Sequence, residues 1–475
     1  MRIWTGRAGS GKTTAILREI AALSERGEGR QILLVPELNS HLMERRLAAA
    51  THNHGARTAE VLTFSRLADR VFSEVGGLAQ QMLTPAGQLL TLQEAARRVQ
   101  GGLSAWKGLA DKPELLQEAL RLIDECKTCA VAPETLFAAA EESEDAVLAE
   151  KLSDLAQILT AYERLCDESL PDPRDRLTHL RDRLAESHTL DGAAVYLDGF
   201  LGFTVQESAV VDAMLAAGVP LSAAVTCDTD YPEIFLTGCK TVQKLTRMAK
   251  HHNQTVERIE LGESKVARPE GLAALERESL LPVRTPQESA AGVRLYEAAS
   301  PFDECEHAAA YIRRKVRDEG ARCRDFVVAA RDIEPYSAFL AMAMARYDIP
   351  VFLAEKPDLL SRPPMALVTN ALEAVRNHFR YEDLFSCLKT GLAGLDWDEI
   401  DKLENYVLTW NIRGGAWERE WTEHPEGYGL SIDENAKAQL AELNTLRKRA
   451  IAPFSALREA LAGEQPAGDC VRALY

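Results

Sequence analysis

A run of residues near the start of the chain matches the phosphate-binding pattern G-x-x-x-x-G-K-[ST] in full. Its members are Gly6, Arg7, Ala8, Gly9, Ser10, Gly11, Lys12 and Thr13. In such a loop, glycines let backbone N–H groups turn toward phosphate oxygens, and the following helix presents its positive end to them. We expect Lys12 to contact the β and γ phosphates and Thr13 to hold Mg²⁺. Because an apolar strand precedes the loop and an amphipathic helix follows it, the pattern favours binding of ATP with Mg²⁺ over a chance glycine-rich turn.

A P-loop ATPase also needs acidic side chains at the end of a second strand. One of them holds the water shell of Mg²⁺, and another polarises the attacking water. Asp198 ends an apolar run and is the best candidate for the metal role. The next residue is Gly199, which has no side chain, and Glu207 lies farther along. The sequence therefore predicts metal and phosphate contacts from Thr13 and Asp198, but it assigns no catalytic residue.

Short apolar segments alternate with helical patterns around these residues. Strands are predicted at residues 2–5, 31–35, 61–64, 193–198 and 220–226, with a helix over residues 12–26. This alternation predicts an α/β fold with a parallel sheet covered on both faces. The first domain would comprise residues 1–77 plus 190–262. A helical insertion would interrupt it at residues 78–189, where apolar residues recur about every 3.6 positions.

The rest of the chain predicts a linker, a second α/β stretch and a further helical region. A charged segment containing Pro and Gly, residues 263–290, is the expected linker. Residues 291–362 are expected to begin a second α/β domain. Its elements are predicted as strands at residues 293–297 and 325–330, an extended piece at 351–353 and a helix over 302–319. Residues 363–475 are expected to be a helical insertion, cut short where the chain ends.

Composition narrows the possible locations and partners. The longest apolar runs are far shorter than the roughly 20 residues that a bilayer span needs, and no secretory leader is evident. We therefore expect a cytoplasmic protein without a membrane segment. The net charge of −17 does not favour nucleic-acid binding, so any contact with DNA needs a local groove lined by Lys and Arg.

The nine cysteines are scattered without regular spacing, which predicts reduced thiols. Cys126 and Cys129 form a C-x-x-C pattern, but no second pair follows at the spacing of a zinc site. A helix places such residues on one face by default, so we favour no metal or redox role for them.

The segment around Asp198 is similar to the second ATPase motif of superfamily 1 helicases. In that motif the strand ends in Asp-Glu and leads through an aromatic residue to a Thr or Ser and a Gln. Asp198, Phe200, Thr204 and Gln206 match this pattern, whereas Gly199 stands where the family has its catalytic Glu.

Further matches extend the resemblance to nearly the whole chain. They are the opening phosphate loop, Leu34-Val-Pro-Glu37, Leu62 to Ala68 and Ser300 to His307. Together these motifs resemble the N-terminal portion of AddB-type subunits of the bacterial AddAB helicase-nuclease. Two departures stand out: Leu38 replaces the Gln that usually follows Pro-Glu, and the chain has too few residues before Gly6 for the segment that grips adenine in motor helicases.

The resemblance implies RecA-like P-loop domains and a heterodimer with an AddA-type helicase-nuclease subunit. It also implies binding to single-stranded DNA and duplex ends during double-strand break repair by homologous recombination. The family's nuclease domain, with its metal-binding acids and iron–sulfur cysteines, is not expected in this chain. The chain is accordingly expected to have no nuclease activity and to be a degenerate motor with little ATPase activity.

Single-stranded DNA is expected near Thr63, Phe64, Arg66 and Arg70, because a hydroxyl and guanidinium groups suit phosphates. A structural role carries equal weight: these residues could instead form a buried strand end followed by a surface helix. Arg331 is a candidate for the arginine that stabilises transition-state charge, although a surface role is favoured.

The alternative function is an active DNA-stimulated P-loop ATPase or helicase. A small-molecule kinase is a weaker form of that alternative, because the length and the second α/β stretch fit a two-domain motor better.

Overall fold

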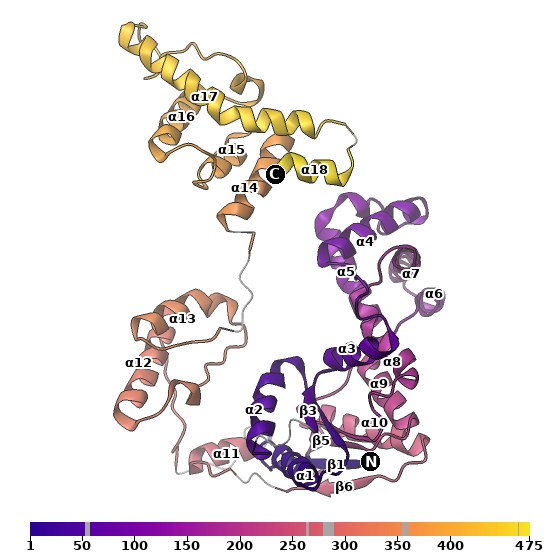
Figure 1. The fold of residues 1–475 in the computed structure, drawn as a ribbon. Coiled ribbons are helices and arrows are strands. Elements are labelled where there is room, and N and C mark those ends of the chain that lie inside the picture. Colours follow the sequence, from indigo (N-terminus) through magenta and orange to yellow (C-terminus); the bar gives the residue numbers. More distant parts are fainter. Residues whose placement is uncertain (53–57, 263–265, 279–288, 354–358, 361, 464) are drawn as a thin grey trace. The chain divides into compact units, whose positions relative to one another are not determined.

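The computed structural model describes residues 1–475 except 53–57, 263–265, 279–288, 354–358, 361 and 464 (Figure 1). The chain divides into two compact units, Met1–Arg294 and Leu295–Tyr475. None of the described helices is long and apolar enough to cross a membrane.

The first unit is built on a six-stranded sheet in the order β3-β2-β4-β5-β1-β6. Its strands are β1 (Arg2–Gly6), β2 (Arg30–Leu34), β3 (Ala59–Leu62), β4 (Ala193–Leu197), β5 (Leu221–Thr226) and β6 (Glu257–Glu260). All neighbouring strands are parallel. The predicted α/β fold with a parallel sheet is therefore confirmed. β4 and β5 come from beyond the helical insertion and lie between β2 and β1, so the sheet is assembled from two separated stretches of chain.

Helices cover both faces of this sheet. The helices of the first face are α1 (Lys12–Arg26) and α2 (Ser40–Ala50), and those of the second are α3 (Phe64–Val75), α8 (Arg176–Arg183), α9 (Val205–Ala216) and α10 (Leu236–His251) (Figure 1). Successive strand residues point to opposite faces. On β2, Leu33 packs with α1 and α2, whereas its neighbours Ile32 and Leu34 pack with the second group.

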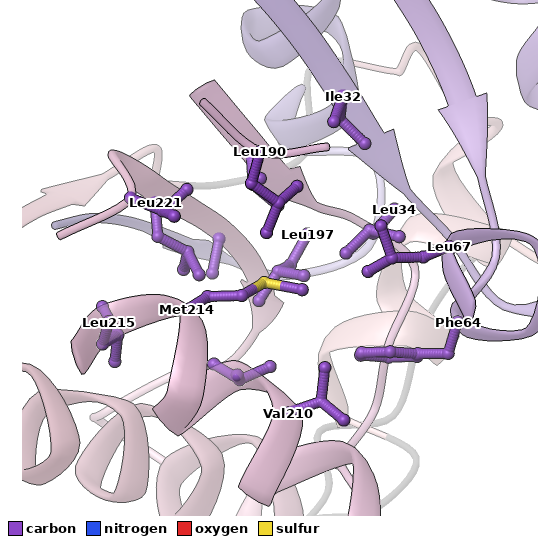
Figure 2. Packing of buried hydrophobic residues seen from close by; sticks show 14 of the residues in the cluster. Ile32, Leu34, Phe64, Leu67, Leu190, Leu197, Val210, Met214, Leu215 and Leu221 are labelled. Atoms are coloured by element: carbon purple, nitrogen blue, oxygen red, sulfur yellow. The ribbon is translucent and has the colours of Figure 1, made fainter. Parts of the chain in front are cut away.

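The core on the second face is continuous from strand to helix. Figure 2 shows Leu34 and Leu197, from neighbouring strands, facing Val210 and Met214 of α9, with Phe64 of α3 beside them. Burying side chains of this size contributes about 1.5–3 kcal/mol each. This packing fixes the carboxyl ends of β2 and β4, where the candidate acid lies.

The insertion between β3 and β4 is helical, as expected from its 3.6-residue periodicity. Its main helices are α4 (Pro85–Val99), α5 (Pro113–Thr128), α6 (Pro133–Glu142) and α7 (Ala146–Glu168). They bury a core of their own that includes Leu92, Ile123 and Tyr162. Asp172 ties the returning chain to this core, because its buried carboxylate accepts hydrogen bonds from Tyr162 Oη and Gln88 Nε2, each at 2.9 Å.

Short 3₁₀ turns link several of these elements. They are η1 (Glu37–Asn39), η3 (Gln100–Gly102), η4 (Leu109–Asp111), η5 (Pro173–Asp175), η6 (Leu184–Glu186), η7 (Cys323–Asp325) and η8 (Gly414–Trp417). The expected linker at residues 263–290 contains a helix, α11 (Glu270–Glu278), whose Ala274 is buried. The segment is therefore not wholly a linker, while its residues 263–265 and 279–288 lie outside the described part.

The second unit begins with two helices, α12 (Pro301–Glu319) and α13 (Glu334–Arg346), which share a small core. The strands predicted at 293–297 and 325–330 are wrong, because the structure assigns no strand to these residues; the predicted extended piece at 351–353 is likewise not part of a strand. The apolar side chains that suggested them are exposed, Leu295 by 99% and Val327 and Phe352 by 90% each. An apolar run becomes a strand only when a neighbouring strand pairs with its backbone groups.

The rest of this unit is helical, as predicted for residues 363–475. The helices are α14 (Pro363–Arg376), α15 (Tyr381–Leu388), α16 (Trp397–Trp410), α17 (Glu434–Ala460) and α18 (Ala467–Leu474). Their core holds Trp417 and Trp421. Arg447 is buried beside the Trp421 ring and donates hydrogen bonds to Trp417 O at 2.6 Å and to Asn444 Oδ1 at 3.1 Å.

Candidate nucleotide-binding site

The phosphate loop closes tightly between the end of β1 and the start of α1. Gly9 and Gly11 have φ values of 79° and 97°, a region that glycine enters at little cost. A Cβ on Gly6 would lie 2.6 Å from Ser10 Oγ, so this position also requires glycine. The loop therefore needs the glycines that its pattern supplies, and the structure gives it the strand-turn-helix context expected from the sequence.

Lys12 lies over the loop. Its Nζ donates hydrogen bonds to Gly6 O at 2.8 Å and to Arg7 O at 2.9 Å. Burial lowers the pKa of Lys12, and the nearby charge of Asp198 partly opposes that effect. An ammonium has three protons to donate, so one remains for a phosphate oxygen.

Asp198 follows β4 and is only 3% exposed. Its backbone N–H donates to Leu34 O at 3.1 Å, which holds the residue at the carboxyl end of the sheet. Burial raises the pKa of its carboxyl group, although a hydrogen bond with the Thr13 side chain and the charge of Lys12 act in the other direction. The structure thus brings together Lys12, Thr13 and Asp198, as the sequence predicted.

Two buried polar atoms at this site have no hydrogen-bond partner within the described residues, namely Ser10 Oγ and Asp198 Oδ2. Leaving such an atom unsatisfied costs about 1–3 kcal/mol, so native proteins rarely do so without a reason. Carboxylate and hydroxyl oxygens are the ligands that suit hydrated Mg²⁺. The donor set of Thr13 and Asp198 beside a phosphate loop therefore fits Mg²⁺ bound to a nucleotide.

Gly199 cannot readily be replaced by a residue that activates water. Its φ is +84°, and a Cβ there would lie 3.1 Å from Asn39 Nδ2 and 3.4 Å from Pro36 Cδ. Glu207 serves a structural purpose instead, because it forms a capping box with Thr204 at the start of α9. Its Oε2 accepts a hydrogen bond from Thr204 N at 2.8 Å.

A hollow of about 640 Å³ borders the loop and was not foreseen from the sequence. Arg7 extends into its wall, where Nε donates to Asp228 Oδ2 at 2.6 Å and the guanidinium lies 4.9 Å from the ring centre of Tyr231. Glu260 of β6 also lines the hollow. The signal that could have found it is the run Asp228-Thr-Asp-Tyr231, which follows the last apolar strand at the same edge of the sheet as the loop.

Two of the candidate DNA-binding residues have structural roles. Thr63 is 1% exposed, and its Oγ1 accepts a hydrogen bond from Arg66 N at 3.2 Å, which caps α3. Phe64 is buried, with its ring centre 5.6 Å from that of Phe200. These positions match the structural alternative that the sequence left open.

The two candidate arginines do lie together. Arg66 pairs with Glu44, and Arg70 pairs with Glu60 at 3.0 Å. All four side chains line a hollow of about 680 Å³ beside the edge strand β3, which we call the β3-edge hollow. Each arginine is more than half exposed but already has a carboxylate neighbour.

Other residues from the sequence interpretation lie elsewhere. Leu38 is 95% exposed. Cys126 is buried near the end of α5, where burial raises the pKa of its thiol, and Cys129 is exposed. Arg331 is exposed and belongs to the second unit.

Replacing Asp198 with Asn is expected to raise the melting temperature by roughly 2 °C while weakening Mg²⁺-dependent nucleotide binding. Burial raises the pKa of Asp198, so folding disfavours its ionised form and the charge costs stability at neutral pH. As the pH falls through the raised pKa, the wild-type carboxylate gains its proton and this disadvantage should shrink. Melting both proteins from about pH 7 down to about pH 4 tests the sign, and a disadvantage that grows with acid would contradict it.

Comparison with known proteins gives one consistent result. The family model described as "ADDB, N-terminal" matches residues 3–276. Proteins named as the B-type component of an ATP-dependent helicase/deoxyribonuclease match over nearly the whole chain. The protein of Acetivibrio thermocellus is 33% identical over 100% of this chain and 43% of its own length. Those of Thermoanaerobacter sp. (strain X514) and Desulforamulus reducens are 30% and 33% identical, over 100% and 95% of this chain and 42% and 41% of their own lengths. The chain spans about two fifths of the length of these relatives.

Proposed function

The chain belongs to the family of AddB N-terminal regions, and we propose that it is a nucleotide-binding, helicase-like part of a subunit that holds DNA in a helicase-nuclease complex. Its motor would be degenerate: it binds ATP with Mg²⁺ but turns it over slowly. An AddA-type subunit would supply the active motor and complete a heterodimer that prepares broken duplex ends for homologous recombination.

The observation that carries this proposal is the contrast within one site. Lys12, Thr13 and Asp198 form a phosphate and metal cradle with unsatisfied buried oxygens, which supports nucleotide binding. Gly199, by contrast, offers no group to orient an attacking water. In this proposal the bound nucleotide stabilises the fold at the carboxyl edge of the sheet, because a ligand that binds only the native state adds to its stability.

The bordering hollow is proposed to take the nucleoside part of the ligand. Tyr231 offers an aromatic ring beside Arg7, and Glu260 offers acceptor oxygens. In this placement the base contacts would come from the β5–α10 loop and β6.

The β3-edge hollow is the proposed site for DNA, and its ion pairs allow a test in which two variants have opposite effects. Replacing Arg66 and Arg70 with Gln is expected to weaken binding of a duplex end several-fold. It should also lower the slope of log K against log salt by about 2, since each phosphate contact contributes about 0.9. Replacing Glu44 and Glu60 with Gln frees the arginines and is expected to strengthen binding.

Fluorescence anisotropy of a labelled duplex end, measured over a range of salt concentrations with the chain and with its partner complex, gives both quantities. Tighter binding by both variants, or no change in either, would contradict the assignment of this hollow to DNA. Failure of the chain to join a helicase-nuclease partner in size-exclusion chromatography would contradict the wider proposal.

A further inference from the structure

Helix α10 carries positive charge along its solvent side. Val242, Leu245 and Ala249 face the core against β5 and α9. The basic residues on the remaining faces are Lys240, Lys244, Arg247, Lys250 and His251. The helix contains no Asp or Glu, which is unusual in a chain with a net charge of −17.

Strand β6 adds a sixth basic residue to the same side. Ile259 packs on the core that contains α1, whereas Val256 packs on the core that contains α10. Because side chains alternate along a strand, Arg258 lies on the α10 side. It lines a hollow of about 450 Å³ together with Arg247 and Lys250.

A second hollow, of about 730 Å³, adjoins the first along the helix. Lys240, Lys244 and His251 line it, and Arg247 lines both hollows. We call the six residues together the α10 basic surface. Over the part of the chain that the structure describes, no carboxylate lies within 4.0 Å of its lysines and arginines, in contrast to the paired arginines of the β3-edge hollow.

Two acidic residues close to this surface have partners of their own. Asp212, which lines the second hollow, is hydrogen-bonded through Oδ1 to His252 Nε2 at 2.9 Å. Asp228, at the start of the loop beside the first hollow, pairs with Arg7. The lysines and arginines of this surface therefore have no ion-pair partner among the described residues, although Asp212 lies in the same hollow.

We propose that the α10 basic surface binds the phosphate backbone of duplex DNA. With a rise of about 1.5 Å per residue, Lys240 and Lys250 lie about 15 Å apart along the helix axis. Each strand of a duplex carries one phosphate per 3.4 Å or so of the helix axis, so a row of this length laid along that axis spans several of them. Single-stranded DNA is bound through aromatic rings on which bases stack, and apart from the His251 imidazole the described residues lining the two hollows provide none.

This inference rests on the proposed function, which makes DNA the substrate, but it concerns a different surface. β3 and β6 are the two opposite edges of the sheet. Variants at the β3-edge hollow and at the α10 basic surface can therefore be compared in one assay.

The test replaces Lys240, Arg247 and Lys250 with Gln, leaving Lys244 in place because its Nζ donates to Ser208 Oγ. The matched control replaces Arg18, Arg97 and Lys151 with Gln. These residues are exposed on α1, α4 and α7, and the net charge changes by the same amount as in the α10 variant. A labelled duplex without single-stranded ends is the probe, and circular dichroism melting verifies that each protein is folded. The α10 variant is expected to bind about tenfold more weakly at low salt, with a salt slope reduced by about 2.7, whereas the control keeps most of its affinity.

Equal losses in the α10 variant and the control would overturn the proposal, since net charge alone would then explain binding. Unchanged duplex binding in the α10 variant, with binding still lost on replacing Arg66 and Arg70, would overturn it while leaving the proposed function intact. Unchanged duplex binding accompanied by weaker assembly with the partner subunit would assign the surface to an acidic protein instead. A preference for single-stranded over duplex DNA that depends on these residues would also overturn it.

Discussion

Replacing Lys12 with Ala is expected to weaken binding of ATP with Mg²⁺ by about two orders of magnitude. Removing one partner of a buried, charge-assisted contact typically costs about 2–5 kcal/mol, and each 1.4 kcal/mol is a factor of about ten in affinity. Lys12 is buried beside the loop and has a proton to spare after its bonds to Gly6 O and Arg7 O. Isothermal titration calorimetry with a slowly hydrolysed ATP analogue measures the loss directly.

The matched control for this change is Arg18→Ala, because Arg18 is an exposed cation on the same helix. Its affinity should stay within about twofold of wild type, since exposed charges far from a ligand contribute little. If Lys12→Ala bound the nucleotide as tightly as wild type, the loop would not be a phosphate site. If both variants lost affinity equally, long-range charge rather than the Lys12 contact would explain the binding.

The sequence predicted the conformation of this loop and its place between a strand and a helix, because that geometry is local. A strand, a glycine turn and a helix follow one another within a few residues, and Gly9 and Gly11 each occupy the backbone region that their type allows. Asp198 was also predictable, because a buried apolar strand that ends in an acid places the acid at the carboxyl edge of a parallel sheet. The sheet itself followed from the alternation of strands and helices.

What the sequence could not predict depends on contacts between distant residues. Arg66 and Arg70 look like free cations in the sequence, and only the fold brings Glu44 and Glu60 beside them. Strand β6 was missed because its residues are mostly charged and exposed, as suits an edge strand. It is positioned by pairing with β1 rather than by its own pattern.

The opposite error arose in the second unit. Val327 and Val328 form part of an apolar run that is typical of a buried strand, but the structure leaves both exposed without a paired strand. An apolar pattern indicates that a segment needs a surface to pack against. It does not indicate whether that surface belongs to the same segment of the chain. The helix before them, α12, was easier to predict because its hydrogen bonds are internal.

ATP turnover by this chain is expected to stay near background even when single-stranded DNA is present. Fast hydrolysis requires a group that orients water and an arginine that neutralises transition-state charge, and the arginine alone is worth about 10³–10⁵-fold in related phosphoryl transfers. Gly199 supplies no such group, and Glu207 is held in the capping box of α9. Binding and turnover should therefore separate, so that calorimetry detects a nucleotide whose hydrolysis a phosphate-release assay scarcely registers.

Gly199→Glu tests whether adding a carboxylate at this position is enough to raise ATP turnover. The new side chain would begin from a backbone with φ near +84° and point toward Pro36 and Asn39, so it would be strained and poorly aimed at the phosphates. We expect turnover to remain within a few-fold of background, with a lower melting temperature than wild type. Gly199→Ala serves as the control for strain without a carboxylate. Robust DNA-stimulated turnover by the unmodified chain, abolished by Lys12→Ala, would contradict the degenerate motor and favour an active ATPase, because only a competent site of its own would depend on both DNA and that lysine.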